Sequence, residues 1–217
     1  MEEHEKWHAR WAAGRIGFHQ PVVNPELVGR WPELVPNAAC TVLVPLCGKS
    51  LDMLWLHARG HRVIGVELSE RACRAFFEEN ALQYTTREVG QHLIFEADDQ
   101  RLVLWCGDFF TITDEQLGRV DAFYDRAAIV ALPPECWAQY AHQFDALVSD
   151  TATGLMLVFD YPQAEREGPP YSVSATDVSV HFGEYFHCAL VDCIELTADN
   201  HWSLSRLQAP ILGFKRL

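Results

Sequence analysis

Apolar runs recur along the chain and are separated by longer stretches of mixed polarity. The runs are rich in Val, Leu, Ile and aromatic residues, a composition typical of strands that are buried on both faces of a sheet. Five such strands are predicted, at residues 40–46, 61–68 and 101–108, within 120–129, and at 154–162.

The stretches between these strands have helical character. Predicted helices cover residues 3–13, 49–59, 69 to about 80, and 133 to about 149. Gly60 suits the end of the second helix, Ser69 the N-cap of the third, and Pro133-Pro134 the start of the fourth. Strands that alternate with helices indicate βαβ units, so we expect an α/β fold with a mainly parallel sheet.

The remaining segments add to this core. Weak alternation over 83–96 predicts an extra hairpin, and residues 166–174 form a loop. The tail predicts an antiparallel strand pair, 187–198 and 203–215, joined by a turn near Asp199-Asn200. There is no linker, repeat or low-complexity tract, so residues 1–217 are expected to form one domain, and nothing demands more than a monomer.

Composition narrows the possible partners. The chain has 217 residues, 49% of them hydrophobic, and 17 basic against 30 acidic side chains give a net charge of −13. This charge disfavours nucleic acid and anionic membranes and favours a small neutral or weakly anionic substrate. The seven cysteines include no C-x-x-C pair, and the N-terminus lacks an apolar leader, so we expect reduced thiols, no metal site and a cytoplasmic location.

Several local patterns are explained without special chemistry. The triplet Gly48-Lys49-Ser50 resembles the end of a phosphate-binding loop, but that loop needs a glycine at position 43, which is leucine. His57 and His61 have the spacing of a helical metal pair, but Gly60 lies between them. A stripe of Trp137, Tyr140 and Phe144 at helical spacing indicates core packing.

Polar residues follow the predicted parallel strands, at the edge where open α/β sheets bind ligands. The clearest is Glu67, which lies 19 residues after Gly48 at the end of the next strand and suits a ribose. A nicotinamide dinucleotide needs more glycines than this loop has, whereas an adenosyl cofactor without phosphates needs fewer. These residues favour S-adenosylmethionine, with Asp108 near the adenine amine. A solvated acid that caps the next helix is the alternative for Glu67.

Four segments carry a resemblance to a known family. They read WHARWAAGRIGFHQ (7–20), VPLCGKSLDMLWLHARGHRVIGVELS (44–69), YDRAAIVALPP (124–134) and GPPYSV (168–173). In this order they resemble the thiopurine S-methyltransferase family over most of the chain. The resemblance implies a Rossmann-like class I methyltransferase fold with a seven-stranded sheet and helices on both faces.

The resemblance also implies an activity. Members transfer a methyl group from S-adenosylmethionine to the sulfur of aromatic or heterocyclic thiols such as thiopurines, leaving S-adenosylhomocysteine. Methylation of selenium or tellurium compounds, which gives resistance to tellurite or selenium, is an alternative. A NAD-linked oxidoreductase and a non-catalytic nucleotide-binding protein are alternatives of other classes.

Site residues follow from matching the family's motifs to this sequence. Cofactor contacts are implied for Trp7, Trp11, Leu46, Glu67, Gly107, Asp108 and Arg126. Phe18 and Pro170 match substrate-facing positions, and Arg206 is a candidate for a second substrate arginine. Arg126 is the expected catalytic residue because its guanidinium can hold a thiolate. The alternatives are that Arg126 pairs with Asp125 or another acid, and that the two tryptophans pack helix 3–13 on the core.

Overall fold

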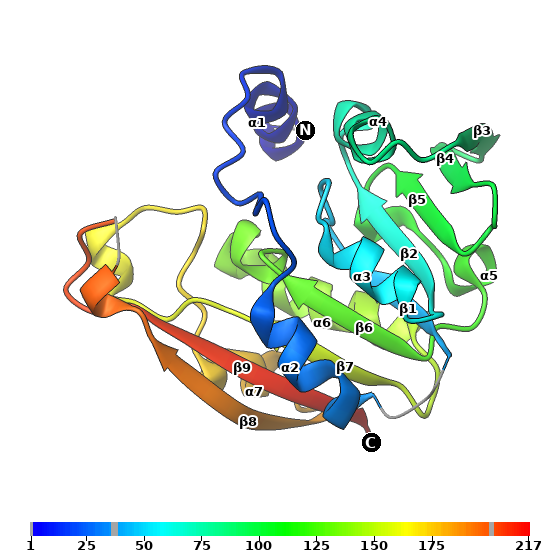
Figure 1. The fold of residues 1–217 in the computed structure, drawn as a ribbon. Coiled ribbons are helices and arrows are strands. Elements are labelled where there is room, and N and C mark those ends of the chain that lie inside the picture. Colours follow the sequence, from blue (N-terminus) through cyan, green and yellow to red (C-terminus); the bar gives the residue numbers. More distant parts are fainter. Residues whose placement is uncertain (1, 36–38, 200–201) are drawn as a thin grey trace.

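The computed structural model describes residues 2–35, 39–199 and 202–217 (Figure 1). Its strands form one sheet of nine strands in the order β3-β4-β5-β2-β1-β6-β7-β9-β8. The strands are β1 (Thr41–Val44), β2 (Arg62–Glu67), β3 (Tyr84–Val89), β4 (His92–Ala97), β5 (Leu102–Cys106), β6 (Ala122–Arg126), β7 (Thr153–Leu157), β8 (Phe186–Glu195) and β9 (Gln208–Arg216).

Helices connect and cover the strands. The α-helices are α1 (Glu2–Ala12), α2 (Pro25–Leu34), α3 (Asp52–Ala58), α4 (Glu70–Glu79), α5 (Asp114–Leu117), α6 (Trp137–Leu147) and α7 (Ala175–Phe182). Short 3-10 turns are η1 (Phe109–Thr111), η2 (Ile129–Ala131), η3 (Pro134–Cys136), η4 (Gln163–Glu165) and η5 (Thr197–Asp199). No helix among the described residues is both long and apolar enough to cross a membrane.

The centre of the sheet is parallel, as predicted. Strands β5, β2, β1, β6 and β7 pair in parallel, and β9 and β8 continue antiparallel at one edge. The expected count of seven strands is too low. The predicted hairpin over 83–96 is β3 and β4, and β4 pairs antiparallel with β5, so the hairpin extends the sheet by two strands.

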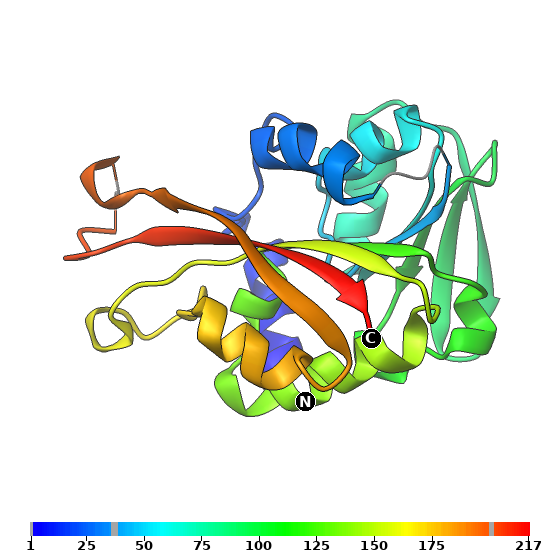
Figure 2. The ribbon, with the colours of Figure 1, turned by 90° about the horizontal axis from the view of Figure 1, so that it is seen from below.

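The sheet separates two hydrophobic cores, because side chains alternate between its faces along each strand. Leu43 and Phe123 belong to the core under α5, α6 and α7, whereas Val42 and Tyr124 belong to the core under α2, α3 and α4. Figure 2 shows the two helical layers on opposite sides of the sheet. The predicted stripe on α6, Trp137, Tyr140 and Phe144, is buried in the first core.

Three α-helices were not predicted: the single-turn α5, and the longer α2 and α7. Helix α2 begins at Pro25 behind the N-cap Asn24, a favourable start, but Pro32 inside the helix obscures its pattern. Helix α7 begins behind Ser174, which forms a capping box with Asp177. Both start signals are in the sequence. Asn24 and Pro25 follow a charged N-terminal segment, and Ser174 follows a proline-rich loop.

Element boundaries shift where a loop is needed at the sheet edge. Helix α3 begins at Asp52 rather than at 49, because residues 45–51 form the connection from β1. Strand β7 ends at Leu157, so residues 158–162 belong to the following connection rather than to the strand. The predicted turn at 199–200 lies partly outside the described residues.

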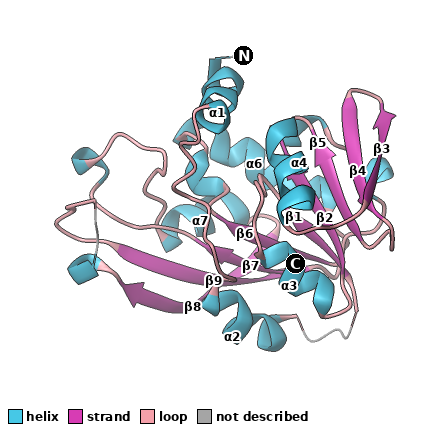
Figure 3. Cartoon of the chain, turned by 45° about the horizontal axis from the view of Figure 1, so that its top comes forward, coloured by secondary structure: helices cyan, strands magenta, loops and turns pink. Residues whose placement is uncertain are grey.

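Helix α1 lies apart from the two layers. It stands beyond the carboxyl ends of the parallel strands, and the loop of residues 13–24 runs from it past the end of β6 to α2 (Figures 1 and 3). The N-terminal segment therefore covers the edge of the sheet where the polar residues of the predicted site lie.

Candidate active site

A cleft of about 530 Å³ opens under α1 at the carboxyl ends of β2 and β5. Its walls come from α1, the start of α4, the hairpin strand β4 and the end of β5. The lining residues are His8, Trp11, Ala12, Leu68, Ser69, Glu70, Arg71, Gln91, Leu93, Cys106 and Gly107. Two of the predicted cofactor residues, Trp11 and Gly107, are in this wall.

Glu67 lies at the end of β2 and is buried, with 6% of its surface exposed. One carboxylate oxygen accepts the N–H of Gly48 at 2.9 Å and the other accepts the N–H of Ser69 at 2.7 Å. Burial raises the pKa of Glu67 to about 7, although these backbone bonds favour the charged form. The alternative of a solvated capping acid is wrong, because Glu67 is buried and the N-cap of α4 is Ser69.

The loop between β1 and α3 is held by this carboxylate. Leu46 has φ of 45° and Gly48 has φ of 54°, a backbone region that side chains disfavour. The N–H of Gly48 is bonded to Glu67, and Lys49 pairs with Glu79 at 2.6 Å. The resemblance of Gly48-Lys49-Ser50 to a phosphate loop is therefore superficial, because its N–H and its lysine are engaged elsewhere.

An aromatic group covers this loop. Phe18 lies edge-to-face with Trp7 at 5.8 Å and with Trp11 at 5.6 Å between ring centroids. A Cβ atom on Gly48 would lie 3.3 Å from Trp11 and 3.6 Å from Phe18. The structure thus brings together the predicted residues Trp7, Trp11 and Phe18 above the glycine turn.

Arg126 ends β6 with 13% of its side chain exposed. Its Nε donates to Asp52 at 2.9 Å, and its Nη1 donates to the carbonyl of Phe18 at 3.4 Å. The expected alternative, an Arg–carboxylate pair, is thus present, but the acid is Asp52. The next residue, Ala127, has φ of 62°, so the chain turns sharply directly after the arginine.

Asp125 has a different set of partners. Its side chain accepts hydrogen bonds from the hydroxyl of Tyr140 at 2.8 Å and from the N–H groups of Ala128 and Ile129 at 3.2 and 3.4 Å. Burial raises the pKa of Asp125 to about 6. This aspartate therefore fixes the turn after β6, which directs Arg126 toward the loop of residues 13–24.

Gly107 and Asp108 follow β5. A Cβ on Gly107 would lie 2.4 Å from the ring of His92, so the hairpin strand β4 packs closely under this position. Asp108 accepts the N–H of Phe110 at 3.0 Å, and its other oxygen lies 3.6 Å from Nε2 of His4 on α1. Gly107 thus lies against β4 and Asp108 beside α1, and their contact with an adenine stays a prediction.

Two predicted substrate residues lie elsewhere. The carbonyl of Pro170 accepts the hydroxyl of Tyr161 at 2.5 Å, within the loop that follows β7. Arg206 pairs with Asp160 and with Gln208, both at 2.7 Å. Neither residue is joined by a described hydrogen bond to Arg126 or Phe18, so the structure does not bring them into the group.

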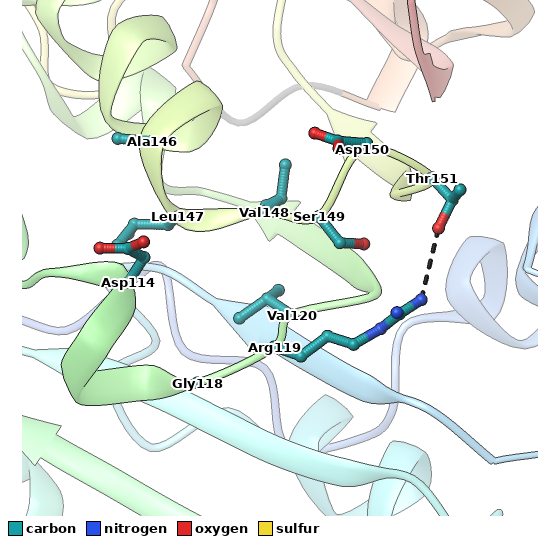
Figure 4. A pocket seen from close by; sticks show the side chains of 10 residues that line it. All are labelled: Asp114, Gly118, Arg119, Val120, Ala146, Leu147, Val148, Ser149, Asp150 and Thr151. Atoms are coloured by element: carbon teal, nitrogen blue, oxygen red, sulfur yellow. Dashed lines mark hydrogen bonds between the residues drawn. The ribbon is translucent and has the colours of Figure 1, made fainter.

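A second depression, of about 440 Å³, lies at the amino ends of β6 and β7 (Figure 4). Arg119 reaches across it to the hydroxyl of Thr151 at 3.5 Å. It contains none of the predicted site residues and lies at the opposite end of the parallel strands. No group of three or more potential metal ligands occurs in the described part of the chain.

Asp52 is the site residue that sequence reasoning missed. It belongs to the same segment as Gly48, residues 44–69, but a carboxylate in the first turn of a helix is common and predicts no special role. Only the fold shows that the end of β6 lies beside it.

Comparisons with known proteins show the family of this chain. Residues 2–212 match the sequence model of the family described as thiopurine S-methyltransferase (TPMT). A thiopurine S-methyltransferase of Marinobacter nauticus is 42% identical over 204 residues, which cover 94% of this chain and 92% of the relative. One from Pseudomonas fluorescens is 46% identical over 177 residues, 82% of this chain and 80% of the relative.

A solved structure supports the fold. The Burkholderia thailandensis 1,6-didemethyltoxoflavin-N1-methyltransferase, with bound S-adenosylhomocysteine, superposes with a TM-score of 0.66 at 14% identity, covering 98% of this chain and 86% of that one. The predicted class I methyltransferase fold and its cofactor, S-adenosylmethionine, are confirmed. This chain belongs to the thiopurine S-methyltransferase family of S-adenosylmethionine-dependent methyltransferases.

Proposed function

We propose that this enzyme transfers the methyl group of S-adenosylmethionine to the sulfur of an aromatic or heterocyclic thiol. The observation that carries the proposal is the placement of Arg126. It is a largely enclosed guanidinium at the sheet edge, bonded to the backbone of an aromatic residue that packs over the glycine turn. A cation beside an aromatic surface suits an aromatic ring that bears a thiolate.

The residues around the cleft fit the cofactor. Each carboxylate oxygen of Glu67 accepts one backbone N–H and retains a lone pair for a ribose hydroxyl. Asp108 has an oxygen beside α1 for the adenine amine, and the turn at Leu46 brings the backbone close to the amino-acid end. Trp7 and Trp11 offer aromatic surface near a sulfonium, a contact worth about 0.5–2 kcal/mol.

The protein's part in the reaction is alignment. The cofactor supplies an electrophilic methyl group and a neutral thioether leaving group. Arg126 holds the thiolate, Phe18 packs on its ring, and the covering segment keeps water out. Heterocyclic thiols are acidic enough to ionise near neutral pH, so the site does not need a strong general base. In this proposal the loop that contains Pro170 closes the substrate side.

A screen with labelled S-adenosylmethionine tests the proposal. Aromatic and heterocyclic thiols, the matching phenols and amines, and reduced selenium and tellurium species serve as acceptors. We expect methylation of the thiols, with phenols at least about 100-fold slower. Turnover of the selenium or tellurium species alone would replace this proposal with metalloid methylation.

The setting of the enzyme completes the proposal. We expect a cytoplasmic monomer that acts on a small molecule and does not bind nucleic acid, because the net charge of −13 opposes phosphate backbones. Sedimentation of the purified chain measures its oligomeric state, and retention on a nucleic-acid column measures binding to nucleic acid.

A further inference from the structure

Asp52 collects hydrogen bonds from three parts of the chain. It is the first residue of α3, and only 2% of its side chain is exposed. Oδ1 accepts the N–H of Asn24 at 2.8 Å. Oδ2 accepts the hydroxyl of Tyr124 at 3.1 Å and Nε of Arg126 at 2.9 Å. The carboxylate therefore joins the covering segment, the sheet and the arginine.

Such an arrangement is not needed for stability alone. Removing two charges from water is costly, and well-packed apolar residues often replace a buried ion pair with no loss of stability. The pair of Asp52 and Arg126 lies at the ligand-binding edge, not in the centre of either core. An ion pair in this place points to a role in orienting the arginine.

The geometry of the guanidinium shows what the orientation achieves. Asp52 occupies Nε, and the Phe18 carbonyl occupies one N–H of Nη1. These two contacts fix the plane of the group, and they leave N–H donors at the outer edge, on Nη1 and Nη2. A planar fork held in this way can present parallel donors to an anion.

We propose that Asp52 is a positioning residue that acts through Arg126. It aims the outer edge of the guanidinium at the methyl acceptor and, through the same group, holds Phe18 and the loop of residues 13–24 over the cleft. The acceptor part of this inference rests on the proposed function, whereas the part that concerns the loop does not.

A double-mutant cycle tests the proposal. The variants are Asp52→Asn, Arg126→Lys and the double variant, assayed for kcat/KM with a heterocyclic thiol. Loss of a charge-assisted bond predicts a fall of about 10- to 100-fold for Asp52→Asn alone. In the Arg126→Lys background the same change should cost less than about 3-fold, because its target is already altered. In either background, the Asp52→Asn change should alter the affinity for S-adenosylhomocysteine by less than about 3-fold.

Tyr124→Phe is the matched control. It removes the other donor to the same carboxylate oxygen and leaves Arg126 untouched. We expect kcat/KM within about 3-fold of the parent enzyme. Equal losses for Tyr124→Phe and Asp52→Asn, or additive losses in the cycle, would show that Asp52 serves only the fold and would overturn the inference.

Amide hydrogen exchange separates this inference from the proposed function. The N–H of His19 donates to the carbonyl of Ile16 at 2.8 Å and reports the order of the loop. Asp52→Asn should speed its exchange, with no further increase in the double variant. If the enzyme methylates no thiol but this pattern holds, the proposed acceptor is wrong and the positioning role stands. Unchanged exchange in Asp52→Asn would overturn the role whichever acceptor is used.

Discussion

The backbone N–H of Gly48 donates to the carboxylate of Glu67 across 2.9 Å, which ties the loop after β1 to the end of β2. The second carboxylate oxygen holds the start of α4 through Ser69. One buried acid thus sets the spacing of two loops that flank the cofactor cleft. Its protonation state should therefore affect the stability of the fold and, because the proposed function has Glu67 bind the ribose, the affinity for the cofactor.

Cofactor affinity should depend on pH through Glu67. Its pKa in the free protein is about 7, raised by burial, and in the proposed site the ribose hydroxyls bind the ionised form. We expect the affinity for S-adenosylhomocysteine to fall by up to about tenfold per pH unit below pH 7 and to level off above it. Calorimetry from pH 5.5 to about 8.5 measures this. Glu67→Gln should bind S-adenosylhomocysteine more weakly, with an affinity that does not change with pH. If the affinity of this variant falls below pH 7 as it does in the parent, another group causes the pH dependence.

Stability should respond in the opposite direction. The ordinary pKa of 4.5 rises to about 7 in the folded state, so the folded protein holds the proton more tightly between these values. The free energy of unfolding then decreases as pH rises from about 4.5 to 7, by an amount on the order of 3 kcal/mol.

Asp125 also makes the free energy of unfolding decrease as pH rises, but over a lower pH range, because burial raises its pKa from 3.8 to about 6. Urea unfolding at a series of pH values gives the free energy of unfolding of the parent and of Glu67→Gln. The contribution of Glu67 is the difference between the two plots of this free energy against pH. Identical dependence on pH in both proteins would contradict the raised pKa.

Gly48→Ala should weaken cofactor binding. The residue has φ of 54°, and the added Cβ would lie 3.3 Å from Trp11, so both backbone strain and crowding of the aromatic cover are expected. We expect a loss of about 1 kcal/mol in stability and a clear rise in the Kd for S-adenosylhomocysteine.

Gly17→Ala is the control for this variant, because its Cβ would meet nothing within 4 Å. It should change neither quantity measurably. A Gly48→Ala enzyme with the parent's Kd would show that the cover does not depend on this close approach.

Cys106 should report occupancy of the cleft. It lines the cleft next to Gly107, and the hydrogen bond from Cys73 lowers the pKa of its thiol. We expect a maleimide to modify Cys106, and S-adenosylhomocysteine to slow this by about tenfold or more at saturation. Peptide mass spectrometry follows the adduct. Cys193 is exposed on β8 and serves as the unprotected control, so equal protection of both thiols would argue against cleft binding.

Sequence patterns predicted the parallel core because its strands are continuous apolar runs that alternate with helical stretches. They also found Glu67 and Arg126, since each ends such a strand. Helix α2 was missed because Pro32 interrupts its period, and the sheet count was low because pairing of the hairpin with β5 is a tertiary property.

The partner of Arg126 could not be predicted for a related reason. Asp52 and Arg126 are 74 residues apart, and Asp125 is adjacent in sequence. Adjacent residues on a strand point to opposite faces, so Asp125 turns into the core toward Tyr140 while Arg126 reaches α3. Spacing alone does not reveal which helix start lies beside a given strand end.

The last prediction compares two arginines. Arg126 is 13% exposed and faces the covering segment, whereas Arg206 is 43% exposed and is engaged with Asp160 and Gln208 beyond the end of β7. If Arg126 holds the reacting anion, Arg126→Ala should lower kcat/KM for a heterocyclic thiol by about 100-fold or more, a loss of roughly 3 kcal/mol of transition-state stabilisation.

Arg126→Lys should retain part of the activity, because lysine keeps the charge but not the planar fork. Arg206→Ala should stay within about 3-fold of the parent, since a half-exposed ion pair contributes little. Steady-state kinetics and calorimetry with S-adenosylhomocysteine on all three variants make the comparison. If cofactor affinity falls in parallel with rate in Arg126→Ala, the arginine anchors the cofactor rather than the acceptor. If Arg206→Ala is as damaging as Arg126→Ala, the acceptor extends to the end of β7, and the loop of Pro170 must bring Arg206 into the site.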